Sequence, residues 1–129
     1  MTAFSPLALL LVGAGGAAGS ILRYAVGIWS TAWLGSFMPW GTLAVNVTGS
    51  AIIGLLGGAM AAGLPMPPEA RLLLITGILG GFTTFSAFSL DTGVLWQRSP
   101  GLALGYLAAT LGLGLGAFAL CHALGRRLF

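Results

Sequence analysis

Apolar residues run almost without interruption through four long stretches of the chain, and polar residues gather between them. A helix that crosses a bilayer needs about 20 predominantly apolar residues in succession. The pattern therefore predicts an all-α membrane protein of one domain with four spans, at residues 6–33, 40–63, 71–96 and 100–124. Each separator contains Pro or Gly with polar or charged residues, as turns require. The first stretch lacks a positively charged start and continues past its small residues, which favours a retained helix over a cleaved signal peptide.

The third stretch contains a segment that is poorly suited to a helix, GGFTTFSAFSLD at residues 80–91. Glycine lowers helix propensity, and Ser and Thr side chains compete for backbone hydrogen bonds. The segment predicts a break in the third helix, although a continuous glycine-rich helix is the alternative. Broken backbone at membrane depth is tolerated only inside protein or beside a polar cavity. Freed carbonyls there would suit a hard cation, and freed N–H groups an anion.

Polar residues also recur at helical spacing in the second and fourth stretches. Thr42, Asn46 and Ser50 share one face of the second helix, and Tyr106 and Thr110 share one face of the fourth. Such residues commonly hydrogen-bond between membrane helices, and this is the simpler interpretation. A polar group inside a membrane is costly unless it is paired, and Asn is the costliest of the first three. Asn46 is therefore the strongest functional candidate among them.

Two phenylalanines of the third stretch, Phe85 and Phe88, lie on one helical face. A phenyl ring has an electron-poor edge, so ring edges that line a pore can assist an anion without a formal charge. Ordinary packing is the commoner role of aromatic residues at this spacing. Asp91 is the sole acidic residue within a predicted span and lies towards its end, which favours passive conduction over proton-coupled pumping.

Composition supports the membrane assignment and excludes several functions. Hydrophobic residues make up 57% of the 129 residues, charged residues only 5%, and the mean hydropathy is +1.02. The basic balance comes from five dispersed arginines, which are no clustered surface for nucleic acid. A single cysteine excludes an intramolecular disulfide, His122 has no assigned role, and no enzyme motif is present.

The arginines give only a weak orientation signal. Arg71, Arg126 and Arg127 would lie on the side of the termini, whereas Arg98 and Arg23 would lie opposite. Orientation follows the Lys/Arg asymmetry of short loops. Three against two is compatible with dual topology and an antiparallel dimer. It is also compatible with a fixed orientation, set by so small a bias or decided by the lipid and the translocon. Several Gly-xxx-Gly pairs also predict close helix packing and an oligomer, namely Gly15/Gly19, Gly54/Gly58, Gly77/Gly81, Gly101/Gly105 and Gly112/Gly116.

Three ordered motifs resemble the Fluc (CrcB) family of fluoride channels along nearly the whole chain. They are GGAAGSILRY at 15–24, WGTLAVNVTGS at 40–50 and GILGGFTTFSAFSLD at 77–91. The resemblance implies a passive, fluoride-selective channel that exports toxic fluoride from the cytoplasm through a multi-pass protein of the inner (plasma) membrane. It further implies a dual-topology antiparallel homodimer with two pores and a structural Na⁺ at its centre.

The resemblance also implies roles for individual residues. Backbone carbonyls of Gly80 and Thr83 would hold Na⁺, and Arg23 would lie near the vestibule. The fluoride pore would be lined by Asn46, Phe85, Phe88, Thr42, Ser86, Tyr106 and Thr110. The chain departs from the family pattern at Gly114, where a further hydroxyl is common, and at Asp91, where a glutamate is expected.

Two other functions remain as alternatives. One is a small proton-coupled multidrug exporter of the four-span, dual-topology type. That mechanism needs a carboxylate in the first span, and residues 6–33 contain none. The other is a non-transporting assembly subunit held to a partner by its glycine faces.

Overall fold

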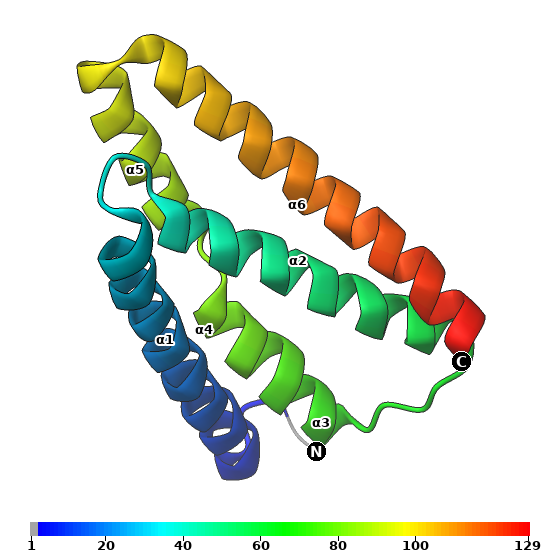
Figure 1. Cartoon of the computed structure of the whole chain (residues 1–129). Coiled ribbons are helices and arrows are strands. Elements are labelled where there is room, and N and C mark those ends of the chain that lie inside the picture. Colours follow the sequence, from blue (N-terminus) through cyan, green and yellow to red (C-terminus); the bar gives the residue numbers. More distant parts are fainter. Residues whose placement is uncertain (1–2) are drawn as a thin grey trace.

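A computed structural model describes residues 3–129 of the chain, and every regular element in that range is a helix (Figure 1). Four of its helical stretches are long and apolar enough to cross a membrane, which confirms the predicted all-helical fold with four spans. The elements are α1 (Pro6–Leu34), α2 (Trp40–Ala61), α3 (Pro68–Arg71), the π-helical segment η1 (Leu72–Leu79), α4 (Gly80–Phe82), α5 (Phe85–Arg98) and α6 (Pro100–Leu128).

The third and fourth spans are longer than the hydropathy pattern indicated. The third covers Pro68–Arg98 and the fourth Pro100–Leu128. Local capping explains where two of the spans begin. The Ser5 hydroxyl accepts from the Ala8 amide at 3.1 Å, and the Ser99 hydroxyl accepts from the Leu102 amide at 3.4 Å. In both cases proline follows the serine at the first helical position, where its fixed φ suits a helix start.

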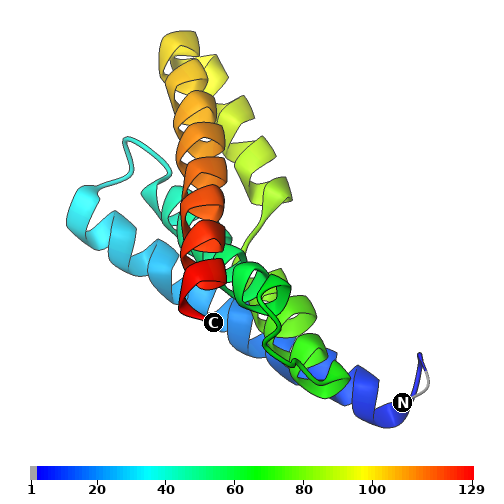
Figure 2. The same ribbon diagram turned by 90° about the vertical axis from the view of Figure 1, so that its right-hand side faces the viewer.

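The four spans divide into two packing groups. The helix α1 packs on η1 and α4, whereas α2 packs on α6, and α5 also packs on α6. Figures 1 and 2 show the two halves of the third span diverging, the first half along α1 and the second towards the start of α6. Contacts between α1 and α2 join the two groups. The junction between α4 and α5 therefore lies where the groups meet.

Glycines bring the paired helices into backbone contact. A Cβ on Gly54 would collide with backbone atoms of Phe118, and one on Gly58 with the backbone of His122. Gly15 and Gly77 approach each other in the same way between α1 and η1. Small residues allow such approach in lipid, where apolar burial gives little drive for association. By contrast, the positions of the other two pairs face open space within this chain, namely Gly101, Gly105, Gly112 and Gly116.

The side chains buried inside one chain are few and are concentrated beside the start of α6. Phe88, Leu95, Ala103 and Tyr106 form a cluster in which Tyr106 is completely buried. Many large apolar side chains of the spans are instead exposed, as expected of helices that face lipid or a second chain. The core therefore fixes α5 against α6 and leaves wide apolar faces uncovered.

Candidate functional site

Two residues in extended conformation separate α4 from α5. Thr83 has φ −86° and ψ 155°, and Thr84 has φ −153° and ψ 125°. The Thr84 hydroxyl accepts from the Ala87 amide at 3.1 Å and so caps the start of α5. The Thr83 hydroxyl donates to the Leu79 carbonyl at 2.9 Å, at the end of the preceding segment. Each threonine thus satisfies one of the two helix ends that the extended residues create.

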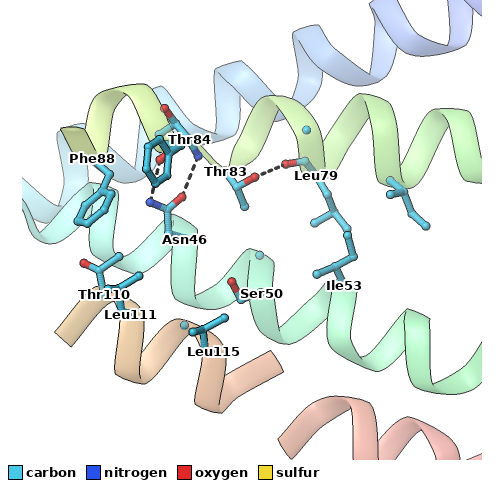
Figure 3. Close-up of a pocket in the computed structure, with 15 residues that line it drawn as sticks. Asn46, Ser50, Ile53, Leu79, Thr83, Thr84, Phe88, Thr110, Leu111 and Leu115 are labelled. Atoms are coloured by element: carbon cyan, nitrogen blue, oxygen red, sulfur yellow. Dashed lines mark hydrogen bonds between the residues drawn. The ribbon is translucent and has the colours of Figure 1, made fainter. Parts of the chain in front are cut away.

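The side chain of Asn46 joins α2 to these extended residues. Its Nδ2 donates to the Thr84 carbonyl at 2.9 Å, and its Oδ1 accepts from the Thr84 amide at 2.8 Å. Figure 3 shows both bonds reaching from α2 to the strand-like segment above it. An amide side chain matches the donor and acceptor of one peptide unit, as the neighbouring strand of a sheet would. Asn46 therefore holds the extended conformation in place.

These side-chain bonds deprive two backbone carbonyls of their usual helical partners. In a continuous helix the Thr84 amide would donate to the Gly80 carbonyl and the Ala87 amide to the Thr83 carbonyl. Here the first amide donates to Asn46 and the second to the Thr84 hydroxyl. The carbonyl of Gly81 accepts instead from Nε of Arg23 in α1, at 3.0 Å. Carbonyl oxygen at this point is thus available for other ligands.

A cavity of about 370 Å³ lies between α2, α6 and the two halves of the third span (Figure 3). Thr110 is 8% exposed, and its hydroxyl has no hydrogen-bond partner among residues 3–129. None of the lining side chains carries a charge, so the cavity combines apolar walls with a few hydrogen-bonding groups. Its lining consists of Asn46, Gly49, Ser50, Ile53, Ile75, Leu79, Gly80, Thr83, Thr84, Phe85, Phe88, Thr110, Leu111, Gly114 and Leu115.

The two phenylalanines differ in burial although they share a face of α5. Phe85 is 76% exposed, whereas Phe88 is 6% exposed. Their ring centroids are 5.7 Å apart in an edge-on arrangement, and Phe88 also lies 5.4 Å from the ring of Tyr106. Edge-to-face contact is a favourable geometry for aromatic pairs. Phe88 is thus fixed by its neighbours, and Phe85 is open to whatever lies beside the chain.

Asp91 forms a polar contact between three spans. Its Oδ2 accepts from the Thr42 hydroxyl of α2 at 2.6 Å and lies 3.5 Å from the Tyr106 hydroxyl of α6. The sequence pattern assigned Asp91 no role, although an acidic residue inside an apolar span is itself a signal. The helical spacing of Thr42 and Tyr106 placed each on a polar face but could not show that an acceptor on α5 joins them.

A second cavity, of about 860 Å³, lies on the α1 side of the same extended segment. Arg23 is the charged residue in its lining. Hydroxyl groups from three elements surround it, so this cavity is more polar than the first. They belong to Ser20, Tyr24, Thr31, Thr42 and Thr84.

Most of the residues singled out by sequence line one of the two cavities, whereas Tyr106 and Ser86 are in the lining of neither. Thr42 and Arg23 line the second cavity, Tyr106 is buried beside Phe88, and Ser86 is exposed with its hydroxyl 3.3 Å from that of Thr84. The rest line the first cavity, namely Asn46, Gly80, Thr83, Phe85, Phe88 and Thr110.

Comparison with known proteins places the chain in a family. Residues 10–122 match the family described as CrcB-like protein, Camphor Resistance (CrcB). A protein of Agrobacterium fabrum named fluoride-specific ion channel FluC is 51% identical over 122 residues, which cover 94% of this chain and 98% of the relative. Proteins of the same name from Rhizobium johnstonii and Rhizobium meliloti are 54% and 52% identical, over 84% and 83% of this chain and 87% and 86% of their own lengths. The resemblance seen in the three motifs is confirmed, and the chain, a multi-pass membrane protein, belongs to the CrcB-like family.

Proposed function

We propose that this chain is a passive, fluoride-selective channel that carries toxic fluoride out of the cytoplasm across the bacterial plasma membrane. The observation that carries the proposal is its 51% identity, over 94% of the chain, to a protein named fluoride-specific ion channel FluC. The chemistry of the two cavities supports it, because both offer hydrogen-bond donors at membrane depth. No residue of α1 is acidic, so nothing in the first span favours a proton-coupled exporter.

Fluoride is small, strongly hydrated and only accepts hydrogen bonds. Moving an ion of carboxylate size into an idealised low-dielectric medium costs about 20 kcal/mol, so donors must replace the lost water. In the first cavity these donors are the second N–H of the Asn46 amide and the Thr110 hydroxyl, and the Ser86 hydroxyl lies 3.3 Å from that of Thr84, which lines the cavity. The edges of Phe85 and Phe88 contribute more weakly. Because no formal charge lines this cavity, binding stays weak enough for the ion to leave.

The second cavity serves as the vestibule of the pore. Arg23 supplies a positive charge there, while its Nε remains bonded to the Gly81 carbonyl. A charge in a concave site with low-dielectric walls raises the local concentration of the opposite ion. Thr42 lies at the rim with its hydroxyl donated to Asp91, and Tyr106 completes that contact. Fluoride thus gathers near Arg23 and continues past Asn46 towards the Phe85–Phe88 pair and Thr110.

The working unit is an antiparallel homodimer with two pores, formed by copies of opposite orientation. Three observations support this assembly. Phe85 is 76% exposed although it lines the first cavity, so one chain leaves that cavity open at its side. In two Gly-xxx-Gly pairs of α6, a Cβ built on any of the four glycines would meet no atom of another element of residues 3–129 within 4 Å. The arginines give little asymmetry between the two ends of the spans.

A structural Na⁺ at the dimer centre fits the chemistry of the extended segment. The carbonyls of Gly80 and Thr83 have lost their helical donors to Asn46 and Thr84, and carbonyl oxygen is a good ligand for a hard cation. Two carbonyls from each of two copies would surround one ion. Bound there, Na⁺ would supply a fixed positive charge near the permeating anion.

Ion efflux from liposomes tests the proposed function. Purified protein reconstituted with trapped KF or KCl should release fluoride rapidly when a potassium ionophore is added, with hardly any release of chloride. Ion-selective electrodes measure both rates, and protein-free liposomes give the background. Equal rates for the two ions would remove the claim of selectivity. Absence of any flux, together with a stable partner after gentle purification, would favour the assembly subunit.

A further inference from the structure

The helices α2 and α6 run side by side, and the closeness of their contact changes along their length. The two helices are in contact, and Figure 1 shows α2 lying beside the second half of α6 and reaching the end of α6. A Cβ on Gly54 would meet Phe118, and one on Gly58 would meet His122, in both cases at backbone atoms. One turn earlier Gly114 of α6 lies opposite Ser50 of α2, and here the nearest atom is the Ser50 hydroxyl oxygen. Close backbone packing thus begins just after Ser50.

There is space beside Gly114, whereas backbone contacts between α2 and α6 leave none beside Gly54 and Gly58. A Cβ built on Gly114 would lie 3.7 Å from the Ser50 Oγ, an ordinary van der Waals distance. Both residues line the first cavity together with Thr110, the residue one turn earlier on α6. Gly114 therefore adds no atoms between the Ser50 hydroxyl and the cavity.

The Thr110 hydroxyl is a group in this part of the cavity that a ligand could satisfy. Thr110 is 8% exposed, and its oxygen has no partner among residues 3–129. A buried polar group without a partner is unfavourable unless something else satisfies it. Figure 3 shows Asn46 and Ser50 on α2 and Thr110 on α6 bordering the same space. A single small acceptor between the helices would receive donors from both.

We propose that Ser50 supplies a further hydroxyl for the permeating anion beyond Thr110, and that Gly114 keeps this hydroxyl accessible. The anion is then bound first by the Thr110 hydroxyl of α6 and next by the Ser50 hydroxyl of α2, because Gly114 of α6 has no side chain. The proposal rests on the proposed function, since the anion in question is the fluoride carried by the channel. It assigns to Gly114 the role of a spacer and to Ser50 that of an ion-contacting residue.

Exchange of the hydroxyl between the two helices tests this proposal. Ser50→Ala should reduce fluoride efflux from liposomes by about tenfold, the effect expected when one hydrogen bond to an ion is lost. Adding Gly114→Ser to Ser50→Ala should restore most of the flux, because it returns a hydroxyl to the same level from α6. The matched control is Ser50→Ala with Gly112→Ser, since a Cβ built on Gly112 would meet nothing within 4 Å in the part of the chain that the structure describes. This control should not restore flux.

Three results would overturn the proposal. Wild-type flux in Ser50→Ala would show that the ion does not use this hydroxyl. Failure of Gly114→Ser to restore flux, or equal restoration by Gly112→Ser, would show that a hydroxyl at this level is not what was lost.

If Ser50→Ala does not give a monodisperse protein, Ser50→Cys, which keeps the size but donates weakly, takes its place with the same expectations. A wild-type protein without fluoride flux would refute the proposed function as well, whereas a conducting wild type with an unaffected Ser50→Ala would refute only this inference.

Discussion

Asn46 combines two tasks in one side chain. Its amide satisfies both backbone groups of Thr84, and the second N–H of Nδ2 remains for a ligand. The first task concerns the shape of the backbone, and the second concerns the ion. Substitutions that remove different parts of this hydrogen bonding should therefore differ in their effects on flux and on stability.

Asn46→Asp should abolish most fluoride flux while the chain still folds. The carboxylate can accept from the Thr84 amide, but it cannot donate to the Thr84 carbonyl or to an anion, and its charge repels fluoride. We expect flux to fall by at least about tenfold, as for the loss of one hydrogen bond to an ion, measured by efflux from liposomes. Thr48→Ala, an exposed change on the same helix, is the control and should conduct normally.

Asn46→Leu should in addition lower stability, because the backbone of Thr84 loses both of its side-chain partners. We expect a loss of about 2 kcal/mol, the sum of two ordinary hydrogen bonds, in the free energy of unfolding. Titration with sodium dodecyl sulfate in mixed micelles measures it. A variant as stable as wild type would show that the extended segment does not depend on this amide.

Phe85→Ile should suppress flux without reducing the stability of the monomer. Phe85 is 76% exposed, so little packing within the chain is lost, but the ring edge offered to the anion is removed.

Phe88→Ala should instead lower stability by about 3–5 kcal/mol, because this ring is buried against Tyr106. Efflux and detergent unfolding distinguish the two effects. Leu90→Ala, another exposed change on α5, serves as the control.

At the scale of elements, the halves of the third span belong to different neighbours. The segments η1 and α4 pack on α1, whereas α5 packs on α6. Hydropathy could predict the four spans and their approximate limits, because the count of apolar residues is set by membrane thickness. It could not predict the π-helical turns of η1 or the separate partners of the two halves, because both depend on packing between distant residues.

Neighbouring glycines of α2 differ in how closely they approach α6, so adding one methyl group should change stability differently at each. Gly58→Ala should destabilise the chain by about 1–3 kcal/mol, because its Cβ would collide with the backbone of His122. Gly57→Ala should be tolerated, since its Cβ would lie 3.5 Å from the His122 ring. Detergent unfolding of the two variants compares them directly. Equal losses would indicate that the close contact of Gly58 with the backbone of α6 does not decide how these positions respond.

The candidate site illustrates how far helical spacing can lead. Spacing placed Asn46 on a polar face and Thr110 one turn from Tyr106, and both line or adjoin the first cavity. Spacing could not show that Asn46 reaches Thr84, that Arg23 reaches Gly81, or that Asp91 accepts from Thr42. Each of these bonds joins different spans. Their partners become neighbours only after the helices pack.

At the scale of the whole molecule, the structure shows which arginines can influence the orientation of the chain in the membrane. Arg23 donates to the Gly81 carbonyl inside the helix packing, so it is not a loop charge. Arg98 donates to the Phe37 carbonyl and lies over its ring, at the opposite end of the spans from Arg71, Arg126 and Arg127. We expect this small bias to permit both orientations. Reporter fusions at the C-terminus should therefore be found in both compartments, and a single orientation would contradict the antiparallel dimer.

The pairing of α2 with α6 also has a consequence for how the protein is made. Their contacts join the second span to the fourth, which is synthesised later, and Thr110 and Gly114 of α6 complete one wall of the first cavity. During translation α2 therefore enters the bilayer with the glycine face that meets α6 uncovered, and this face stays so until α6 leaves the ribosome. A nascent chain halted before α6 would expose Ser50, Gly54 and Gly58 to lipid. Such a chain would be a natural target for membrane quality control.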